Sequence, residues 1–247
     1  MAYATIFNRC LIAAALVFPA IPAGGPWDKV PQEWNLSETY QILRDSPWSP
    51  AKVKLDAIYP QRHTDPQTGI VSDSPVNPQD TKPVRGVEIS RSKPLPSISV
   101  LWWSSRTIRL AKQRLRQLRS QAAPAQPLRA DDLPDYVLVI EGSEPLRILR
   151  DAREDLRDTV FLELDAGTTV DLANVRFLDA NADEDARTEF HFPRQIDGHA
   201  TLDPNSERVV FHCKASAKNP RPGRQNSLSL RAEFEPRSMR AHGQPDL

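Results

Sequence analysis

The sequence predicts an α+β fold rich in β-structure: a mostly antiparallel sheet or sandwich with two or three helices. Short alternating apolar segments recur in the last third of the chain between polar turns, a pattern typical of antiparallel strands. Two other segments, 36–43 and 106–119, repeat apolar residues at helical spacing. The chain also has 23 prolines and 9 glycines, and because proline interrupts regular structure we expect many loops.

The first 23 residues follow the order of a secretory signal peptide. One basic residue, Arg9, precedes an apolar run from Cys10 to Phe18, and small residues and prolines follow up to Ala23. This order is typical of exported proteins, and we expect cleavage after Ala23. A membrane span needs about 20 apolar residues, and the run from Cys10 to Phe18 is much shorter. We therefore expect no transmembrane anchor in the mature chain. An ordinary core helix is the alternative interpretation.

We expect three parts in the precursor: a signal peptide at 1–23, a tryptophan-rich helical segment at 24–50, and a single β-rich α+β domain at 51–247 with a proline-rich loop at 60–96. Export would place the mature protein in the periplasm or outside the cell. Cleavage would remove Cys10 and leave Cys213 without an intramolecular partner. Alternation puts Cys213 on the apolar face of its strand, which favours a buried thiol over a reactive one.

The N-terminal segment is predicted to form a short helix among three tryptophans. Asn35 and Glu38 have the spacing of a capping box. Leu36, Tyr40 and Leu43 recur at the spacing of one apolar helix face. The tryptophans are Trp27, Trp34 and Trp48. They can offer a platform to a ligand or partner, or they can pack the helix onto a larger core.

The middle of the chain alternates strands and helices. The expected elements are a strand at Ser97–Trp103, a helix at Arg106–Arg119, a strand at Tyr136–Glu141, a helix from Ser143 through Leu156 and a strand at Thr159–Leu164. This order is compatible with a right-handed crossover unit. In the helix at 106–119, the apolar stripe consists of Ile108, Ala111, Leu115 and Leu118, with the arginines on the other side.

The remaining strands are expected on both sides of this section. They are Lys52–Ile58, Val84–Ile89, Asn174–Leu178, Thr188–Phe192, Arg208–Lys214 and Ser227–Phe234. Close spacing and polar turns between the last four favour antiparallel pairing.

Charge is balanced in total but not along the chain. There are 32 basic and 32 acidic residues, which disfavours a dedicated nucleic-acid binder. Residues 89–130 are basic without any acidic residue, whereas 131–189 are strongly acidic. The two segments can pair inside the molecule. Alternatively, the basic helix serves an anion-binding module, whose candidate residues are Arg106, Arg109, Lys112, Arg114, Arg116 and Arg119.

The start of the basic helix is a further candidate for anion binding. Ser104 and Ser105 stand where its N-cap is expected. The free N–H groups of a helix N-terminus attract anions.

A metal site is a second possibility. The candidate ligands are Asp179, Asn181, Asp183, His191 and His212. The first three alternate as at the start of a calcium loop, but Glu184 stands where that loop requires glycine. The histidines match no standard zinc spacing. We therefore expect a solvated acidic turn and no cofactor.

Several short motifs resemble a group of uncharacterised exported bacterial proteins. They are Trp34 followed by Ile42-Leu43-Arg44-Asp45-Ser46-Pro47-Trp48, the turn Trp103-Ser104-Ser105, Phe192-Pro193-Arg194, and the tail Met239–Leu247. The resemblance implies export and a single domain, and it implies no activity or catalytic residue.

Together these observations favour an exported, non-enzymatic binding or structural envelope protein. Its expected partner is a protein or another envelope component rather than nucleic acid. The alternatives are an exported metal-dependent hydrolase and an anion-binding module built on the basic helix.

Overall fold

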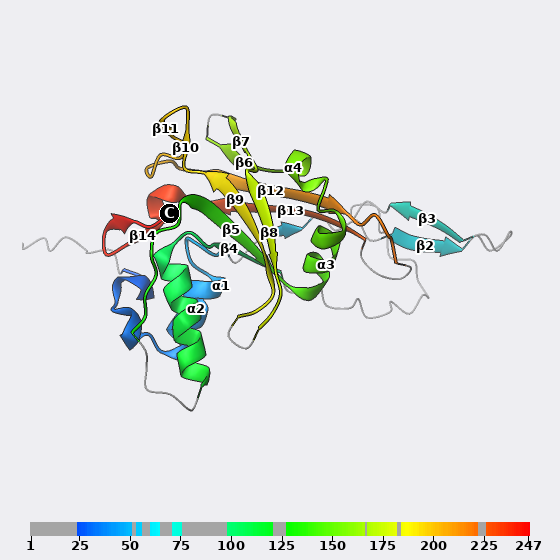
Figure 1. Ribbon diagram of the computed structural model, residues 1–247. Helices are drawn as coiled ribbons and strands as arrows, with labels where there is room; N and C mark the ends of the chain where they lie inside the picture. Colours follow the sequence, from blue (N-terminus) through cyan, green and yellow to red (C-terminus); the bar gives the residue numbers. More distant parts are fainter. Residues whose placement is uncertain are drawn as a thin grey trace, which may run out of the picture.

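The computed structural model describes the chain at residues 24–50, 53–55, 60–64, 71–75, 98–120, 127–165, 167–181, 184–221 and 226–247. These residues form antiparallel sheets flanked by helices (Figure 1), which confirms the predicted α+β, β-rich class. The predicted signal peptide at 1–23 and the predicted strand at 84–89 lie outside the described residues. Within the expected proline-rich loop, β2 (Pro60–Thr64) and β3 (Val71–Pro75) pair as an antiparallel hairpin.

A five-stranded sheet follows the order β1-β13-β12-β6-β7. Its strands are β1 (Lys54–Leu55), β6 (Val160–Leu164), β7 (Thr169–Asp171), β12 (Val209–Ser216) and β13 (Ser227–Phe234). Phe211 in β12 is opposite Leu162 in β6 and Ala232 in β13, and all three are fully buried. Cys213, two residues on, is also fully buried, which confirms the predicted buried thiol.

A four-stranded sheet packs against the first. It has the order β4-β5-β9-β8, with β4 (Ser99–Trp102), β5 (Asp135–Glu141), β8 (Asn174–Leu178) and β9 (Arg187–Pro193). The ring centroids of Phe190 and Phe192 in β9 lie 5.4 and 6.3 Å from that of Phe211. Trp102 of β4 lies 5.1 Å from Phe234 of β13. The two inner faces therefore share one core, as in a β-sandwich.

Four α-helices occur in the described part of the chain, against the two or three expected. They are α1 (Leu36–Arg44), α2 (Arg106–Arg119), α3 (Ser143–Asp151) and α4 (Leu156–Thr159), and the 3-10 helices are η1 (Pro26–Asp28), η2 (Pro31–Glu33) and η3 (Pro236–Ser238). The additional helix arises because the segment expected as one helix is divided by a turn at 152–155.

The N-terminal helix α1 packs beside α2 (Figure 1). Its start has the predicted capping box, since Asn35 accepts from the Glu38 N–H and the Glu38 carboxylate accepts from the Asn35 N–H. Its buried residues are Thr39, Ile42 and Leu43. The predicted apolar face was partly wrong, because Leu36, at the first helical position, is 47% exposed.

The predicted crossover unit was also wrong. A crossover joins parallel strands of one sheet, but β4 and β5 pair antiparallel, and β5 and β6 belong to different sheets. Helix α2 covers the outer side of the four-stranded sheet, and α3 lies where the chain passes from one sheet to the other (Figure 1).

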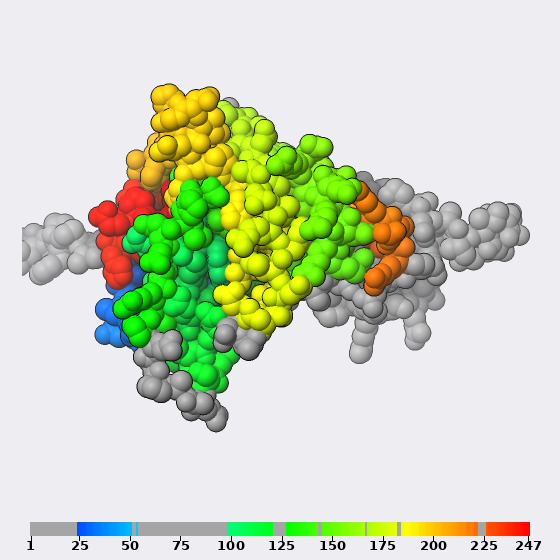
Figure 2. Space-filling model, in the orientation of Figure 1, coloured from blue at the N-terminus to red at the C-terminus, as the bar shows by residue number. Residues whose placement is uncertain are grey.

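Two tight hairpins complete the described chain. They are β10 (Gln195–Ile196) with β11 (His199–Ala200), and β14 (Arg240–Ala241) with β15 (Gln244–Pro245). Each turn needs positive φ, which Gly198 and Gly243 supply at 79° and 75°. The β10–β11 hairpin projects at the top of the space-filling view (Figure 2), and the other carries the tail back to α2.

Candidate anion-binding cleft

The tail of the chain closes the N-terminus of α2. The carboxylate of Asp246 accepts hydrogen bonds from the N–H groups of Arg106 and Thr107 at 2.8 and 2.9 Å. It also accepts from the Ser105 hydroxyl at 2.7 Å, and the Ser105 side chain caps the Ile108 N–H as predicted. The position that an external anion would take at a helix N-terminus is therefore filled by the protein itself.

Helix α2 buries most of the predicted apolar stripe, and several of its cations lie on another side of the helix, along a cleft. Ile108 and Ala111 are fully buried and Leu115 nearly so, whereas Leu118 is 37% exposed. Four cations follow at i, i+3, i+7 and i+10 and therefore share one side of the helix. They are Arg109, Lys112, Arg116 and Arg119.

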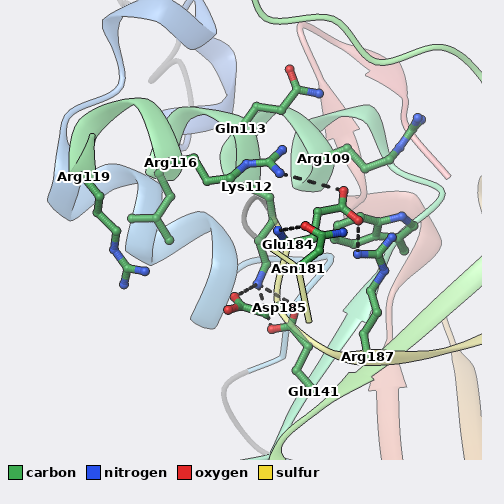
Figure 3. A pocket seen from close by; sticks show the side chains of 12 residues that line it. Arg109, Lys112, Gln113, Arg116, Arg119, Glu141, Asn181, Glu184, Asp185 and Arg187 are labelled. Atoms are coloured by element: carbon green, nitrogen blue, oxygen red, sulfur yellow. Dashed lines mark hydrogen bonds and ion pairs between the residues drawn. The ribbon is translucent and has the colours of Figure 1, made fainter. Parts of the chain in front are cut away.

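These four cations line a cleft of about 370 Å³ between α2, the end of β5 and the segment that leads into β9 (Figure 3). Arg187 of β9 is a fifth cation in its wall, and Glu141, Glu184 and Asp185 are its carboxylates. Trp103 and Leu115 supply apolar surface. The cleft thus carries two more positive than negative charges, although the whole chain is neutral.

The inner cation of the cleft, Lys112, is neutralised. Its Nζ lies 2.6 Å from Oε1 of Glu141, and both side chains are less than a fifth exposed. Asp185 lies farther from the same ammonium, at 3.8 Å. Lys112 therefore acts chiefly as the internal partner of Glu141.

Arg187 is held rigidly on the floor of the cleft. Its guanidinium donates to Glu189 at 2.9 Å and to Glu184 at 2.8 Å. It also lies 4.6 Å from the centroid of the Trp103 ring, a cation–π distance. Burial opposes its charge, but the hydrogen bonds to the two glutamates outweigh burial and raise the pKa of Arg187.

The three arginines of α2 that line the cleft have other partners. Arg116 lies 3.8 Å from Glu184. Arg119 donates to the Tyr40 hydroxyl, and Arg109 donates to the carbonyl groups of Ser104 and Ser105. Those neutral acceptors do not offset positive charge. Burial lowers the pKa of Arg109, which remains far above neutral pH as for any arginine.

The other two candidates of the basic helix do not line the cleft. Arg106 pairs with Asp132, and the Arg114 guanidinium donates to the Trp34 carbonyl at 2.9 Å. The structure thus brings together four of the six predicted anion-binding residues and adds Arg187. Sequence reasoning missed Arg187 because it lies in the acidic segment. The only sequence signal for it is its position two residues from Glu189 in the same strand, which puts both side chains on one face.

The predicted calcium-like turn is engaged in local contacts. Asp179 pairs with Arg150, and the Asn181 side chain accepts from the Glu184 N–H at 2.8 Å. Asp183 lies outside the described residues.

The two candidate histidines lie in different sheets. His191 in β9 contacts Asp135 at 3.2 Å, while His212 in β12 contacts Glu163 at 2.8 Å. The hydrogen bond with His212 lowers the pKa of Glu163. Across the described ranges, no three His, Cys, Asp or Glu side chains are grouped so that they could hold a metal ion.

Of the three N-terminal tryptophans, Trp34 and Trp48 belong to the hydrophobic core and Trp27 packs against it. Trp34 and Trp48 are 1% and 0% exposed. Trp27 contacts Trp48 edge to face at 5.5 Å, and the Trp48 indole donates to the Asp246 carbonyl at 2.6 Å. Trp27 and Trp34 also border a second, less enclosed cleft of about 780 Å³ beside residues 241–247.

No family model, curated protein or solved structure matches this chain. Among the helices of the described residues, none has the length and apolar character needed to cross a membrane. A functional assignment therefore depends on the geometry and charge of the α2 cleft, defined as the cavity lined by Arg109, Lys112, Arg116, Arg119 and Arg187.

Proposed function

We propose that this is an exported, non-enzymatic binding protein and that the α2 cleft holds an anionic ligand. The observation that carries the proposal is the row of four cations along one side of α2, facing an enclosed space in a chain of zero net charge. Guanidinium groups bind carboxylate, sulfate and phosphate through paired hydrogen bonds, so the four arginines that line this cleft favour a ligand with such groups.

Export is supported by the signal-like order of residues 1–23. In the periplasm or outside the cell, the protein would meet anionic components of the envelope. Intact mass measured on protein recovered from culture medium or periplasm tests this part. The expected mass is that of a chain that begins at Gly24. Full-length protein found solely in the cytosol would contradict export.

Anion binding is tested by calorimetric titration at low ionic strength with sodium phosphate and sodium galacturonate as probes. The double variant Arg116→Ala/Arg119→Ala is expected to weaken binding at least tenfold, because it removes two of the cations that line the cleft. A matched control is Arg150→Ala/Arg237→Ala, which removes two exposed arginines outside the cleft. Equal losses in both proteins, or no binding by the wild type, would refute the site.

The rival interpretation, a metal-dependent hydrolase, predicts a bound metal. Elemental analysis of protein purified without chelators measures it directly. We expect less than stoichiometric transition metal, and a stoichiometric amount would overturn the non-enzymatic proposal.

A further inference from the structure

We propose that the outer face of the five-stranded sheet carries a separate binding site for a phosphate group, centred on Arg231. In β13, Ala232 and Phe234 are buried, and the Phe234 ring lies 5.1 Å from that of Trp102 in the other sheet. Arg231 alternates with these core residues and therefore lies on the outer face. The α2 cleft is on the outer side of the other sheet, so this inference does not depend on the proposed function.

The partly buried guanidinium of Arg231 has no acceptor in the part of the chain that the structure describes. Its Nε–H is buried without a hydrogen-bond partner, and it forms no ion pair with a described residue. The residues directly opposite it are His212 in β12 and Lys54 in β1, and neither is acidic. A buried donor without an acceptor is unfavourable, and an ion that binds beside it would satisfy it.

Two carboxylates on the same face are engaged by other cations. Glu163 lies 2.8 Å from Nε2 of His212 and 3.2 Å from Arg208. Glu233, two residues after Arg231, lies 3.3 Å from Nε of Arg208. Arg208 thus pairs with both glutamates, which leaves the positive charge of Arg231 for a group from outside the fold.

Two further donors lie beside Arg231 on this face. Ser229 precedes it by two residues in β13, and Lys214 of β12 is directly opposite Ser229. Residues that are diagonal across two antiparallel strands are about 7–8 Å apart, so the long side chains of Lys214 and Arg231 can reach one group between them. Lys214 is exposed and, across the described ranges, forms no ion pair.

This set of donors favours phosphate over carboxylate. A carboxylate has two oxygens, and one guanidinium can bind both of them. A phosphate monoester has a third free oxygen, which the Lys214 ammonium and the Ser229 hydroxyl can bind. The ligand is therefore a phosphate group, either free or at the end of a larger molecule.

Titration of the full folded chain, followed by amide NMR, tests the inference and separates the two sites. Inorganic phosphate and glycerol 3-phosphate should shift the amide signals of Lys214, Ser229 and Arg231, and acetate should bind there at least tenfold more weakly. Co-sedimentation with vesicles of phosphatidic acid, compared with phosphatidylcholine, tests a lipid headgroup as the source. Specific binding of any of the three phosphates supports the site and identifies the source, whereas binding of none overturns it.

The variant Arg231→Gln should weaken the response of these amides to phosphate at least tenfold, while the response of the α2 cleft stays within twofold. Arg231→Lys keeps the charge but loses the paired donors, and should weaken it at least threefold. Arg237→Gln, which removes an exposed arginine elsewhere, is the control. Because Arg231 has no described partner, the urea midpoint of Arg231→Gln should not fall, so lost binding would not reflect lost folding.

The pattern of shifted amides distinguishes this inference from the proposed function. If phosphate shifts only the amides of α2, or if Arg231→Gln responds like the wild type, the inference fails and the α2 cleft stands. If phosphate shifts only the amides of β12 and β13, the inference stands and the α2 cleft fails. Acetate that binds as tightly as phosphate would overturn the assignment of the ligand.

Discussion

The two ends of α2 use charge in opposite ways. At the N-terminal end, the carboxylate of Asp246 takes three hydrogen bonds and leaves no room for an external anion. Toward the C-terminal end, Arg116 and Arg119 line the α2 cleft, where Arg116 lies 3.8 Å from Glu184 and Arg119 donates to the Tyr40 hydroxyl. One end thus anchors the helix in the fold, and the other lines the cleft for which we propose an anionic ligand.

This difference shows that neighbouring arginines of one helix need not share a role. Arg106 and Arg116 belong to the same basic segment, yet Arg106 is engaged by Asp132 at the anchored end. The role depends on which residue from elsewhere in the chain meets each side chain. The predictions below test the contrast between the anchored end and the open end.

The largest effect is expected in the buried stripe near the anchored end. Ile108→Ala removes a fully buried side chain and should lower the free energy of unfolding by about 2–5 kcal/mol. The control Leu118→Ala, at the open end and 37% exposed, should cost less than about 1 kcal/mol. Urea denaturation measures both, and equal losses would contradict the assigned orientation of α2.

A smaller loss is expected when the tail contact is removed. Asp246→Ala deletes the acceptor of two backbone N–H groups and one hydroxyl, and should cost about 2 kcal/mol in the free energy of unfolding. Asp246→Asn keeps one acceptor oxygen and should cost about half as much. An unchanged denaturation midpoint in Asp246→Ala would mean that this end is not anchored by the tail.

At the open end, stability should barely change. Arg119→Ala removes an exposed contact with Tyr40, so the free energy of unfolding should stay within about 0.5 kcal/mol of the wild type. The same urea experiment checks this value. A loss as large as that of Asp246→Ala would show that Arg119 is structural, and the contrast between the two ends would then be lost.

The smallest effect concerns one carboxyl group at the anchored end. The hydrogen bond from Arg106, with its charge, holds the pKa of Asp132 below its ordinary value. A carboxyl group whose pKa is lower in the folded state stabilises the fold at pH values above its ordinary pKa. This stabilisation is lost as the pH falls through the lowered pKa. An NMR titration should therefore give a midpoint below about 3.9 that rises in Arg106→Ala. An unchanged midpoint would exclude the pair in solution.

Local patterns predicted those elements whose limits are decided locally. The helix α2 and the strands β8 and β13 begin and end where the apolar spacing placed them. Four of the two-residue strands, β10, β11, β14 and β15, carry no periodicity and were not predicted. Antiparallel pairing was predicted for the last strands of the chain and is found for β8 with β9 and for β12 with β13. The pairing of β4 with β5 was not predicted, because the helix between them in the sequence suggested a parallel crossover, whereas the two strands run antiparallel.

The candidate site was predicted in outline. The charge pattern placed four lining cations correctly on one helix, but it did not separate them from Arg106 and Arg114. That separation depends on Asp132 and the Trp34 carbonyl. Similarly, the anion expected at the start of α2 proved to be Asp246, which is 140 residues from Arg106 in sequence and has no local signal.

The reactivity of the buried Cys213 thiol can be used to measure how often the five-stranded sheet opens. The residue is fully buried in the middle of the five-stranded sheet, and burial raises the pKa of its thiol. Because a thiol reagent attacks an accessible thiolate, labelling of Cys213 must await separation of β12 from its neighbours, and its rate measures how often the sheet opens. In denaturant the same reagent counts two thiols in the full sequence and one after loss of residues 1–23, so a single titration follows both opening and processing.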